Sequence, residues 1–539
     1  MKKLLCAAIL AAGLWSCVEV NQEIGGDFIA TNQQYDIYTA EFDIEDVRMG
    51  KIDSLSGYSS KRITIGAVRD DTFGLYRRGC ALSLVPVLDT FDFGRNPVFQ
   101  RFTFRAALDS TSVPDESQRN ILQNVRVYPL TEPLDYKKNF ARTKVPHGPQ
   151  AISKGVPVTN GKDSLEFDFT EAFGKQYLNI TQHDLTDFDS YMAKFPGIYM
   201  ETDAPAGEGG RIDMFQMDIL RLNGNAMLRT DNYAILRFNA EYEGARKDTA
   251  LIFYFSPISF QDLDSLANNK ATPSQYVFNV DSHETDGMIG PADEQLYIEG
   301  GSGLKPYIPA TEIRRLIEGE VRKHGGTLAN TVISKATVEL PFEFPENKAQ
   351  IDRYPKILSP TVRMQTDTTM NFAGLTDASV STENQGEIDR SRLVYAPDIT
   401  HHAQQLIRQD DPEKIRDYDV WFLVMWYEVK TTTNESAAQL AEYYQQMAYY
   451  EYYNQLYGGG YGYGSYYGGM GGGYGYNSYY NNYMSYALAS AYASSSTSNS
   501  SKQKETVLDT HRYYNAYLNG PTNPGARPTI RIVYSVPKN

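Results

Sequence analysis

Acidic residues close together in the sequence are the first candidates for chemistry in this chain. Asp70 precedes Asp71, Glu201 lies near Asp203, and residues 281–287 (DSHETDG) hold three carboxylates. Two carboxylates that face one sugar ring can hydrolyse a glycosidic bond, and a carboxylate-rich loop can bind Ca²⁺. The chain contains 66 Asp and Glu residues, so we expect most such groups in solvated loops. The 281–287 segment also lacks the spacing of an EF-hand.

Three further motifs favour structural interpretations. His401 and His402 are adjacent, so on a helix their side chains point about 100° apart, whereas zinc proteases place two His ligands at i and i+4. The GGSG segment 300–303 lacks the Lys-Ser/Thr of a phosphate-binding loop, and we expect a tight turn. Cys80 has no His nearby in the sequence, and we expect a buried thiol. We therefore predict no catalytic residue, no metal site and no cofactor.

The first seventeen residues read MKKLLCAAILAAGLWSC. Two lysines precede an apolar run, Leu4–Trp15, that is shorter than the roughly 20 residues of a membrane span and is typical of a secretory signal peptide. The closing LWSC resembles a bacterial lipobox. We predict that residues 1–16 are a signal peptide, that Cys17 is lipidated, and that residues 17–34 are a tether. The alternative is an ordinary signal peptide followed by a chance cysteine.

The net charge of −15 and the pI near 5.1 argue against binding to nucleic acid or electrostatic binding to an anionic membrane, because both need a basic surface. Membrane attachment would therefore depend on the covalent lipid. Of the three cysteines, Cys6 leaves with the signal peptide and Cys17 carries lipid, so no intrachain disulfide can form. We expect a lipid-anchored protein of the outer membrane, exposed on the cell surface.

Short runs that alternate between apolar and polar residues recur along the chain, and runs of this kind predict antiparallel β-sandwiches. They are 35–42, 62–65, 81–85, 101–104, 124–128, 164–169, 234–238, 251–255, 336–340, 419–427 and 529–534. We expect a mainly β fold with two tandem sandwich domains, 35–257 and 275–539. Short helices are predicted over 311–318 and 398–407. Trp421 and Trp426, five apart, should point to opposite faces of their strand, and at least one should lie in the core.

Residues 434–505 interrupt this pattern. The segment begins with a stretch that can form a helix, continues as almost pure Gly and Tyr over 458–476, and ends rich in Ser. We interpret it as an insertion between two strands: either a disordered loop or a recognition arm, because Tyr offers a large contact area at low entropy cost. Residues assigned to recognition are Tyr443, Tyr450, Tyr457, Tyr463, Tyr467 and Tyr476.

Several motifs together resemble a Bacteroidota lipoprotein family, domain of unknown function 4270. They are EIGGDFI (23–29), IGAVRDDTFG (65–74), FPGIY (195–199), LYIEGGSGL (296–304) and LNG (518–520) followed by RPTIRIVY (527–534). The resemblance spans nearly the whole mature chain, and the Gly/Tyr insertion departs from it. It implies an envelope lipoprotein with tandem jelly-roll-like sandwiches and assigns no catalytic residues.

These observations predict a non-enzymatic outer-membrane lipoprotein that serves as a structural or accessory subunit of an envelope complex, such as one for outer-membrane protein biogenesis or secretion. The expected partners are an outer-membrane β-barrel or other lipoproteins. A glycan-binding surface lipoprotein is the alternative, and a hydrolase is the third candidate.

Overall fold

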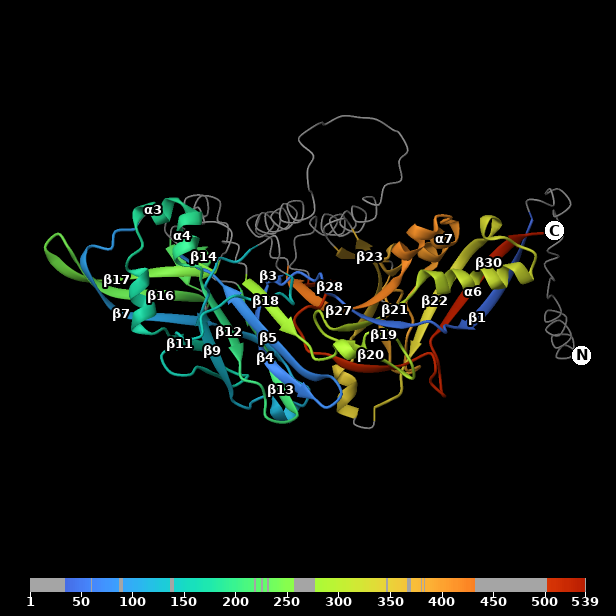
Figure 1. The fold of residues 1–539 in the computed structure, drawn as a ribbon, viewed down its shortest axis with the longest axis horizontal. Helices are drawn as coiled ribbons and strands as arrows, with labels where there is room; N and C mark the ends of the chain where they lie inside the picture. The colour runs from blue at the N-terminus through green and yellow to red at the C-terminus, as the bar shows by residue number, and fades with distance from the viewer. Residues whose placement is uncertain are drawn as a thin grey trace, which may run out of the picture.

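The computed structural model describes residues 34–59, 61–86, 91–135, 140–217, 220–223, 226–229, 232–255, 277–345, 348–365, 370–379, 381, 383–431 and 502–538. The fold is mainly β, and every strand pair among these residues is antiparallel, which confirms the predicted fold class. Figure 1 shows the elements gathered in two lobes along the long axis of the molecule.

The first lobe comprises the described residues between 56 and 282 and contains two large sheets. One has the order β10-β9-β12-β5-β4-β13-β8, with β18 pairing β5 and β3, and the other has the order β11-β7-β16-β17-β6. The strands are β3 (Tyr58–Ser59), β4 (Arg62–Asp70), β5 (Gly74–Leu82), β6 (Leu84–Pro86), β7 (Arg95–Ala106), β8 (Leu108–Ser112), β9 (Gln123–Pro129), β10 (Val158–Thr159), β11 (Leu165–Asp168), β12 (Ile198–Thr202), β13 (Gly209–Gln216), β14 (Leu220–Asn223), β15 (Ala226–Arg229), β16 (Tyr233–Tyr242), β17 (Ala245–Phe255) and β18 (Val277–Ser282).

Alternation along β16 shows how the sequence builds this core. Leu236 and Phe238 are fully buried, and Arg237 between them points outward, as the two-residue period of a strand requires. Three short helices, α2 (Glu171–Tyr177), α3 (Gln182–Thr186) and α4 (Phe188–Lys194), belong to the same lobe. In α2, Phe173 and Tyr177 lie four residues apart on one face, and both pack against Phe102 of β7.

The second lobe comprises residues 34–52 and the described residues between 283 and 538. Its sheets have the orders β1-β30-β22-β26-β25 and β19-β2-β21-β27-β23-β24, with β28 pairing β27 and a separate pair β20-β29. The strands are β1 (Tyr35–Asp43), β2 (Arg48–Lys51), β19 (Gly290–Pro291), β20 (Gln295–Glu299), β21 (Leu304–Ile308), β22 (Val332–Pro341), β23 (Ile357–Gln365), β24 (Met370–Gly374), β25 (Ile388–Asp389), β26 (Val394–Tyr395), β27 (Val420–Thr431), β28 (Lys502–Leu508), β29 (Asn515–Asn519) and β30 (Thr529–Pro537).

The helices of the second lobe are α6 (Ala310–Lys323), α7 (Thr400–Arg408) and α8 (Pro412–Ile415). Ile313, Ile317 and Val321 recur every four residues on α6 and are fully buried, so this helix presents one apolar face to the core. Both predicted helices, 311–318 and 398–407, overlap α6 and α7, and every predicted β run overlaps a strand.

Strand pairing crosses the predicted domain boundaries in both directions. The first strand, β1, pairs along its whole length with the last, β30, and β2 pairs with β21. Figure 1 shows the blue β1 beside the red β30 at one end of the molecule. In the other direction, β18 pairs with β5 in the first lobe. The first lobe is therefore an insertion within the second.

Most of the Tyr/Gly-rich segment 434–505 lies outside the described residues. Thr431 of β27 pairs directly with Lys502 of β28, so the two residues that flank 432–501 are neighbours. The last four residues of the predicted arm, 502–505, belong to β28. From the sequence pattern alone, the flanking strands would be Trp421–Val429 and Ile530–Val536; in the structure the second flanking strand is β28.

Candidate functional site

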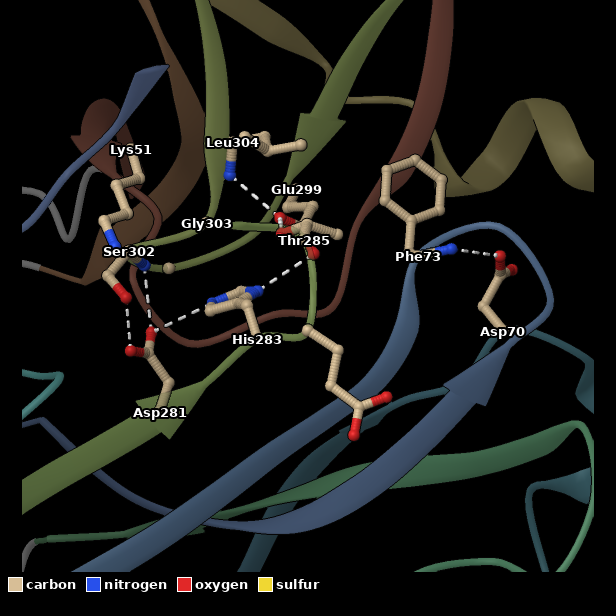
Figure 2. A network of polar contacts seen from close by, with 12 residues as sticks. Lys51, Asp70, Phe73, Asp281, His283, Thr285, Glu299, Ser302, Gly303 and Leu304 are labelled. Carbon is tan, nitrogen blue, oxygen red and sulfur yellow. Dashed lines mark hydrogen bonds and ion pairs between the residues drawn. The ribbon is translucent and has the colours of Figure 1, made fainter. Parts of the chain in front are cut away.

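A group of ionisable side chains is enclosed where the two lobes meet (Figure 2). Asp281 lies on β18 of the first lobe, His283 follows it, and Glu299 ends β20 of the second lobe. Their side chains are 0%, 1% and 4% exposed. Buried charges are costly unless they are paired and hydrogen-bonded, so the partners of these residues decide what the group can do.

Asp281 receives polar contacts from both lobes. Ser302 donates its backbone N–H at 2.9 Å and its hydroxyl to the two carboxylate oxygens. Nη1 of Arg78, on β5, lies 3.4 Å from Oδ2, and Nε2 of His283 lies 3.7 Å from the same oxygen. This carboxylate therefore joins β5 and β18 of the first lobe to the turn after β20 of the second.

Glu299 contacts the other nitrogen of the His283 imidazole, on the side away from Asp281. Its Oε1 lies 2.9 Å from Nδ1 of His283, and its Oε2 accepts hydrogen bonds from Thr285 Oγ1 at 2.7 Å and from the N–H of Leu304 at 2.9 Å. Figure 2 shows His283 between the two carboxylates. The imidazole thus bridges an acid of each lobe.

The GGSG segment forms the expected turn, in which the N–H of Gly303 donates to the carbonyl of Gly300. Buried Lys305 directs its Nζ at three carbonyls of this region, those of Glu299, Gly301 and Gly303, at 2.6, 3.3 and 3.2 Å. Gly301 has φ +52°, and a Cβ there would lie 2.3 Å from Asp281 Oδ2. Glycine is therefore needed at this position to let the turn approach the carboxylate.

The electrostatics follow from this enclosure. Burial disfavours the charged form of Asp281, but its contact with His283 and the charges of His283 and Arg78 outweigh burial, and its pKa is lowered. For His283, burial acts to lower the pKa, and the charge of Glu299 and the contact with Asp281 raise it above the ordinary value. Burial lowers the pKa of Lys305 to about 8, against the charges of Glu299 and Asp281, so this ammonium stays largely charged at neutral pH.

A second polar cluster lies beside the first. Asp509 accepts hydrogen bonds from the N–H of His511 at 3.0 Å and from Arg512 Nη1 at 2.9 Å. His511 Nε2 lies 3.2 Å from Ser59 Oγ of the first lobe, and the Arg512 guanidinium stacks 4.1 Å from the Trp426 ring centroid. Burial and the neighbouring Arg78 lower the pKa of His511 to about 3, so this imidazole is neutral at physiological pH.

Two further polar pairs also connect the two lobes. Arg62 Nη1 lies 3.1 Å from Glu428 Oε1, and Asn515 Nδ2 donates to Asp70 Oδ2 at 2.7 Å. Hydrogen bonds and ion pairs therefore join the lobes at several points. The residues at the centre of this contact are shielded from solvent, so this arrangement can fix the two lobes but offers no open surface on which a substrate could meet the Asp281–His283–Glu299 group.

The three carboxylates of 281–287 diverge. Glu284 accepts from the N–H of Leu75 at 2.9 Å, and exposed Asp286 pairs with Lys51 and Arg142 at 3.2 and 3.1 Å. Among the described residues, no group of three or more His, Cys, Asp and Glu side chains is arranged to hold a metal ion. The described residues therefore provide no set of ligands for a Ca²⁺ ion at segment 281–287.

The other acidic pairs also serve local structure. Asp70 Oδ1 accepts the N–H groups of Thr72 and Phe73 at 2.9 and 3.1 Å in the β4–β5 turn. Asp203 pairs through both oxygens with Arg126 on β9. Asp70 is therefore engaged by backbone donors and Asp203 by a partner of opposite charge.

His401 and His402 point in different directions, as their adjacency predicted. Both backbone N–H groups donate to the carboxylate of Asp377 at the start of α7. The His402 ring is buried and its Nε2 lies 2.8 Å from the carbonyl of Tyr418, while His401 is exposed. Burial lowers the pKa of His402 to about 4. Cys80 is buried, as expected, and burial raises the pKa of its thiol.

Trp421 and Trp426 occupy different environments. Trp421 is 4% exposed and stacks on Tyr307, with ring centroids 4.3 Å apart, and the Arg363 guanidinium lies 5.2 Å from its ring. Trp426 is half-buried beneath Arg512. Neither ring offers an open platform for a sugar.

The predicted lipidation site and the predicted recognition residues lie outside the described residues. They are Cys17, Tyr443, Tyr450, Tyr457, Tyr463, Tyr467 and Tyr476.

Sequence reasoning missed Arg78, Glu299 and Lys305. Each stands in or beside an otherwise apolar strand, and a charged residue at an inward-facing strand position signals a buried ion pair, since such residues are almost never fully buried without a partner. A charged residue at such a position can be recognised individually from the sequence. This signal does not say which of the many acids in the chain meets Arg78, because the partners are about 200 residues apart in the sequence.

In the described part of the chain, no helix is both long and apolar enough to cross a bilayer. Comparisons of the chain with family models, with curated proteins and with solved structures find no match.

Proposed function

We propose that this chain is a lipid-anchored protein of the outer membrane, held through Cys17 and exposed on the cell surface, and that it serves as a structural or accessory subunit of an envelope complex. Its partners would be an outer-membrane β-barrel involved in protein biogenesis or secretion, or other lipoproteins. The role needs neither catalysis nor a cofactor. The lipobox and the motifs similar to domain of unknown function 4270 are the sequence basis for this proposal.

The burial of the Asp281–His283–Glu299 group is the structural observation that supports it most. Ionisable residues that could act as acid, base or nucleophile are used here to bind one lobe to the other. A catalytic site needs such groups at a cavity where substrate can reach them. A protein that fixes the relative position of two β lobes is suited to carry surfaces for other proteins.

The acidic surface hollow of the first lobe gives little support to a hydrolase. It has a volume of about 730 Å³ and surrounds the tip of the β16–β17 hairpin, where Asp92, Glu241, Glu243 and Asp248 line it. Hydrogen bonds from Asn239 and Gln100 lower the pKa of Asp248. A general acid for glycoside hydrolysis needs the opposite shift.

Membrane fractionation with a matched pair of cysteine variants tests the proposal. Cys17→Ala should move the protein out of the membrane fraction and abolish palmitate labelling, whereas Cys80→Ala, which changes a buried thiol, should leave both unchanged. Retention of membrane partitioning and label by Cys17→Ala would overturn the anchor. Purification of the native protein from gently solubilised outer membrane should recover a barrel or a lipoprotein in constant ratio, and recovery of the chain alone would overturn the accessory role.

A surface hollow on the second lobe favours glycan binding as a second candidate. It has a volume of about 550 Å³, and amide, imidazole, guanidinium and phenol groups line it: His401, Gln404, Gln405, Arg408, Gln409 and Tyr418. Amides and an aromatic ring suit sugar hydroxyls and ring faces. Binding of outer-membrane oligosaccharides by calorimetry, lost in Gln405→Ala, would support it, and no heat from any of them would exclude it.

A further inference from the structure

Arg78 has an unused hydrogen-bonding edge in the protein interior. The residue is 2% exposed, and its Nη1 makes the 3.4 Å contact with Asp281. Its Nε and Nη2 have no hydrogen-bond partner among the described residues. Nε and Nη2 lie on one edge of the guanidinium and their N–H groups point the same way. Through this edge an arginine forms a bidentate contact with an oxyanion.

Two other arginines show what this edge does when a partner is present. Arg126 uses Nε and Nη2 on the two oxygens of Asp203, at 2.9 and 2.8 Å. Arg211 is as buried as Arg78, yet its Nε donates to Asp213 at 2.7 Å and its Nη2 to Thr159 at 3.0 Å. Among the buried arginines of the described residues, Arg78 is therefore the one whose Nε and Nη2 both lack an acceptor in the protein.

The Tyr76 hydroxyl is a second unpartnered donor in the same place. Tyr76 is two residues from Arg78 on the same face of β5, and the Arg78 guanidinium carbon lies 5.9 Å from its ring centroid. The hydroxyl is buried and has no partner among the described residues. A Cβ added at Gly301 would lie 3.3 Å from this hydroxyl, so the backbone of the 300–303 turn lies close to it.

The unpartnered groups of Arg78 and Tyr76 can all donate hydrogen bonds. Nε2 of His283 is a further buried atom without a hydrogen bond, and the His283 ring lies 4.6 Å from the Tyr76 ring. Leaving such donors unsatisfied is costly in a buried position. The unpartnered N–H groups of Arg78 and the Tyr76 hydroxyl would be satisfied by a ligand that accepts several hydrogen bonds, as an anion does.

The charges of the enclosed network favour the same ligand. With His283 protonated, the cations Arg78, His283 and Lys305 outnumber the anions Asp281 and Glu299 by one. His511 beside them is neutral, and Asp509 is balanced by Arg512. One monovalent anion would make this buried set electrically neutral.

We propose that Arg78 and Tyr76 form an internal binding site for one small monovalent anion of the size of chloride, at the junction of the two lobes. The anion accepts hydrogen bonds from Nε and Nη2 of Arg78 and from the Tyr76 hydroxyl. It completes the polar network that joins β5 to the 300–303 turn. The site is independent of the proposed membrane role, since it would serve the stability of the fold in any setting.

Thermal unfolding in three sodium salts at equal ionic strength tests the site, with chloride and bromide as ligands and gluconate as an anion too large to enter. Because a ligand that binds the native state raises its stability, the wild-type chain should unfold about 2 °C or more higher in chloride or bromide than in gluconate. Arg78→Met should abolish this difference. Arg211→Met, the matched control, should lower the unfolding temperature in all three salts and keep the difference.

Crystals of the wild-type chain grown in bromide give a second measurement that needs no variant. An anomalous bromine peak beside the Nε–Nη2 edge of Arg78 is the expected result. Should Arg78→Met not fold, Tyr76→Phe preserves charge and shape and should reduce the salt-dependent shift. A shift of equal size in Tyr76→Phe and wild type, or density for water with no anomalous peak, would overturn the proposal.

Discussion

Ser302 donates both its backbone N–H and its hydroxyl to Asp281, although the two residues belong to different lobes. Asp281 lies on β18 in the sheet of the first lobe, and Ser302 lies in the turn between β20 and β21 of the second. Together with Arg78 and His283, this pair makes the lobes one structural unit through hydrogen bonds and charge. The predictions below test how much the fold depends on it.

Asp281→Asn should destabilise the fold by about 3–5 kcal/mol, because Arg78 and His283 would keep buried positive charges that have lost their anion. Asp286→Asn is the control: Asp286 lies five residues further on, is 60% exposed and forms surface ion pairs, so its loss should change stability by about 1 kcal/mol or less. Urea unfolding of both variants measures the two values. Equal losses would mean that the buried carboxylate does not hold the lobes together.

His283 should make the protein less stable as the pH rises above neutral. Its pKa in the folded chain is raised by Glu299 and Asp281, so its stabilising contribution is fully present below about 6.5, its unfolded value, and is lost as the pH rises through the folded pKa. His283→Gln should remove this dependence and should be less stable than wild type at pH 6. Unfolding free energies between pH 6 and 9 test this, and parallel curves for the two proteins would contradict it.

His402 should have the opposite effect from His283 and make the protein less stable as the pH falls below neutral. Burial lowers its pKa to about 4, so its contribution is present above about 6.5 and is lost as the pH falls toward 4. Between pH 7.5 and 5 this group alone should cost about 2 kcal/mol of stability. His402→Gln, which keeps a donor for the Tyr418 carbonyl, should lose correspondingly less over that interval. His511 provides a second group with the same sign, so the variant should keep part of the acid sensitivity.

Residues 432–501 should be dispensable for folding. Because Thr431 pairs with Lys502, an Asn-Gly turn can join the two strands in register, and shortening the connection lowers its closure entropy. The deleted chain should keep the wild-type unfolding temperature or exceed it. Loss of the fold would show that the segment belongs to the core.

The same deletion tests the recognition arm. Partner recovery from outer membrane should fall sharply if the tyrosines bind a partner. Recovery equal to wild type in a folded deletion variant would exclude the arm, and a disordered connection would then be the better interpretation.

Local sequence pattern predicted the strands well, because a half-buried strand needs alternation and the chain shows it, as in Leu236–Arg237–Phe238. It failed for β13, where Arg211 and Asp213 are buried as an ion pair, so that both faces of the strand are buried and its polar residues do not mark a solvent-exposed face. It also missed α2 to α4, whose short lengths give too few turns for a helical period to emerge.

The network between the lobes could not be predicted in the same way. DSHETDG was recognised as a polar cluster, but its residues diverge: Asp281 turns inward to Arg78 and Ser302, while Asp286 stays at the surface. Whether neighbouring acids converge depends on which sheet each backbone segment joins. That choice is made by β18 pairing with β5, a contact between segments about 200 residues apart, and local patterns carry no information about it.

The pairing of β1 with β30 fixes an order of events for a chain that is made from its N-terminus. Residues 35–43 emerge first, but the strand that completes their sheet lies about 490 residues later, so they must wait until nearly the whole chain is available. Residues 56–282 contain all the strand partners of the first lobe and can assemble in the meantime. This early part of the chain would thus become ordered last, and β1, with its apolar residues Tyr35 and Ile37, would lack its partner strand until then.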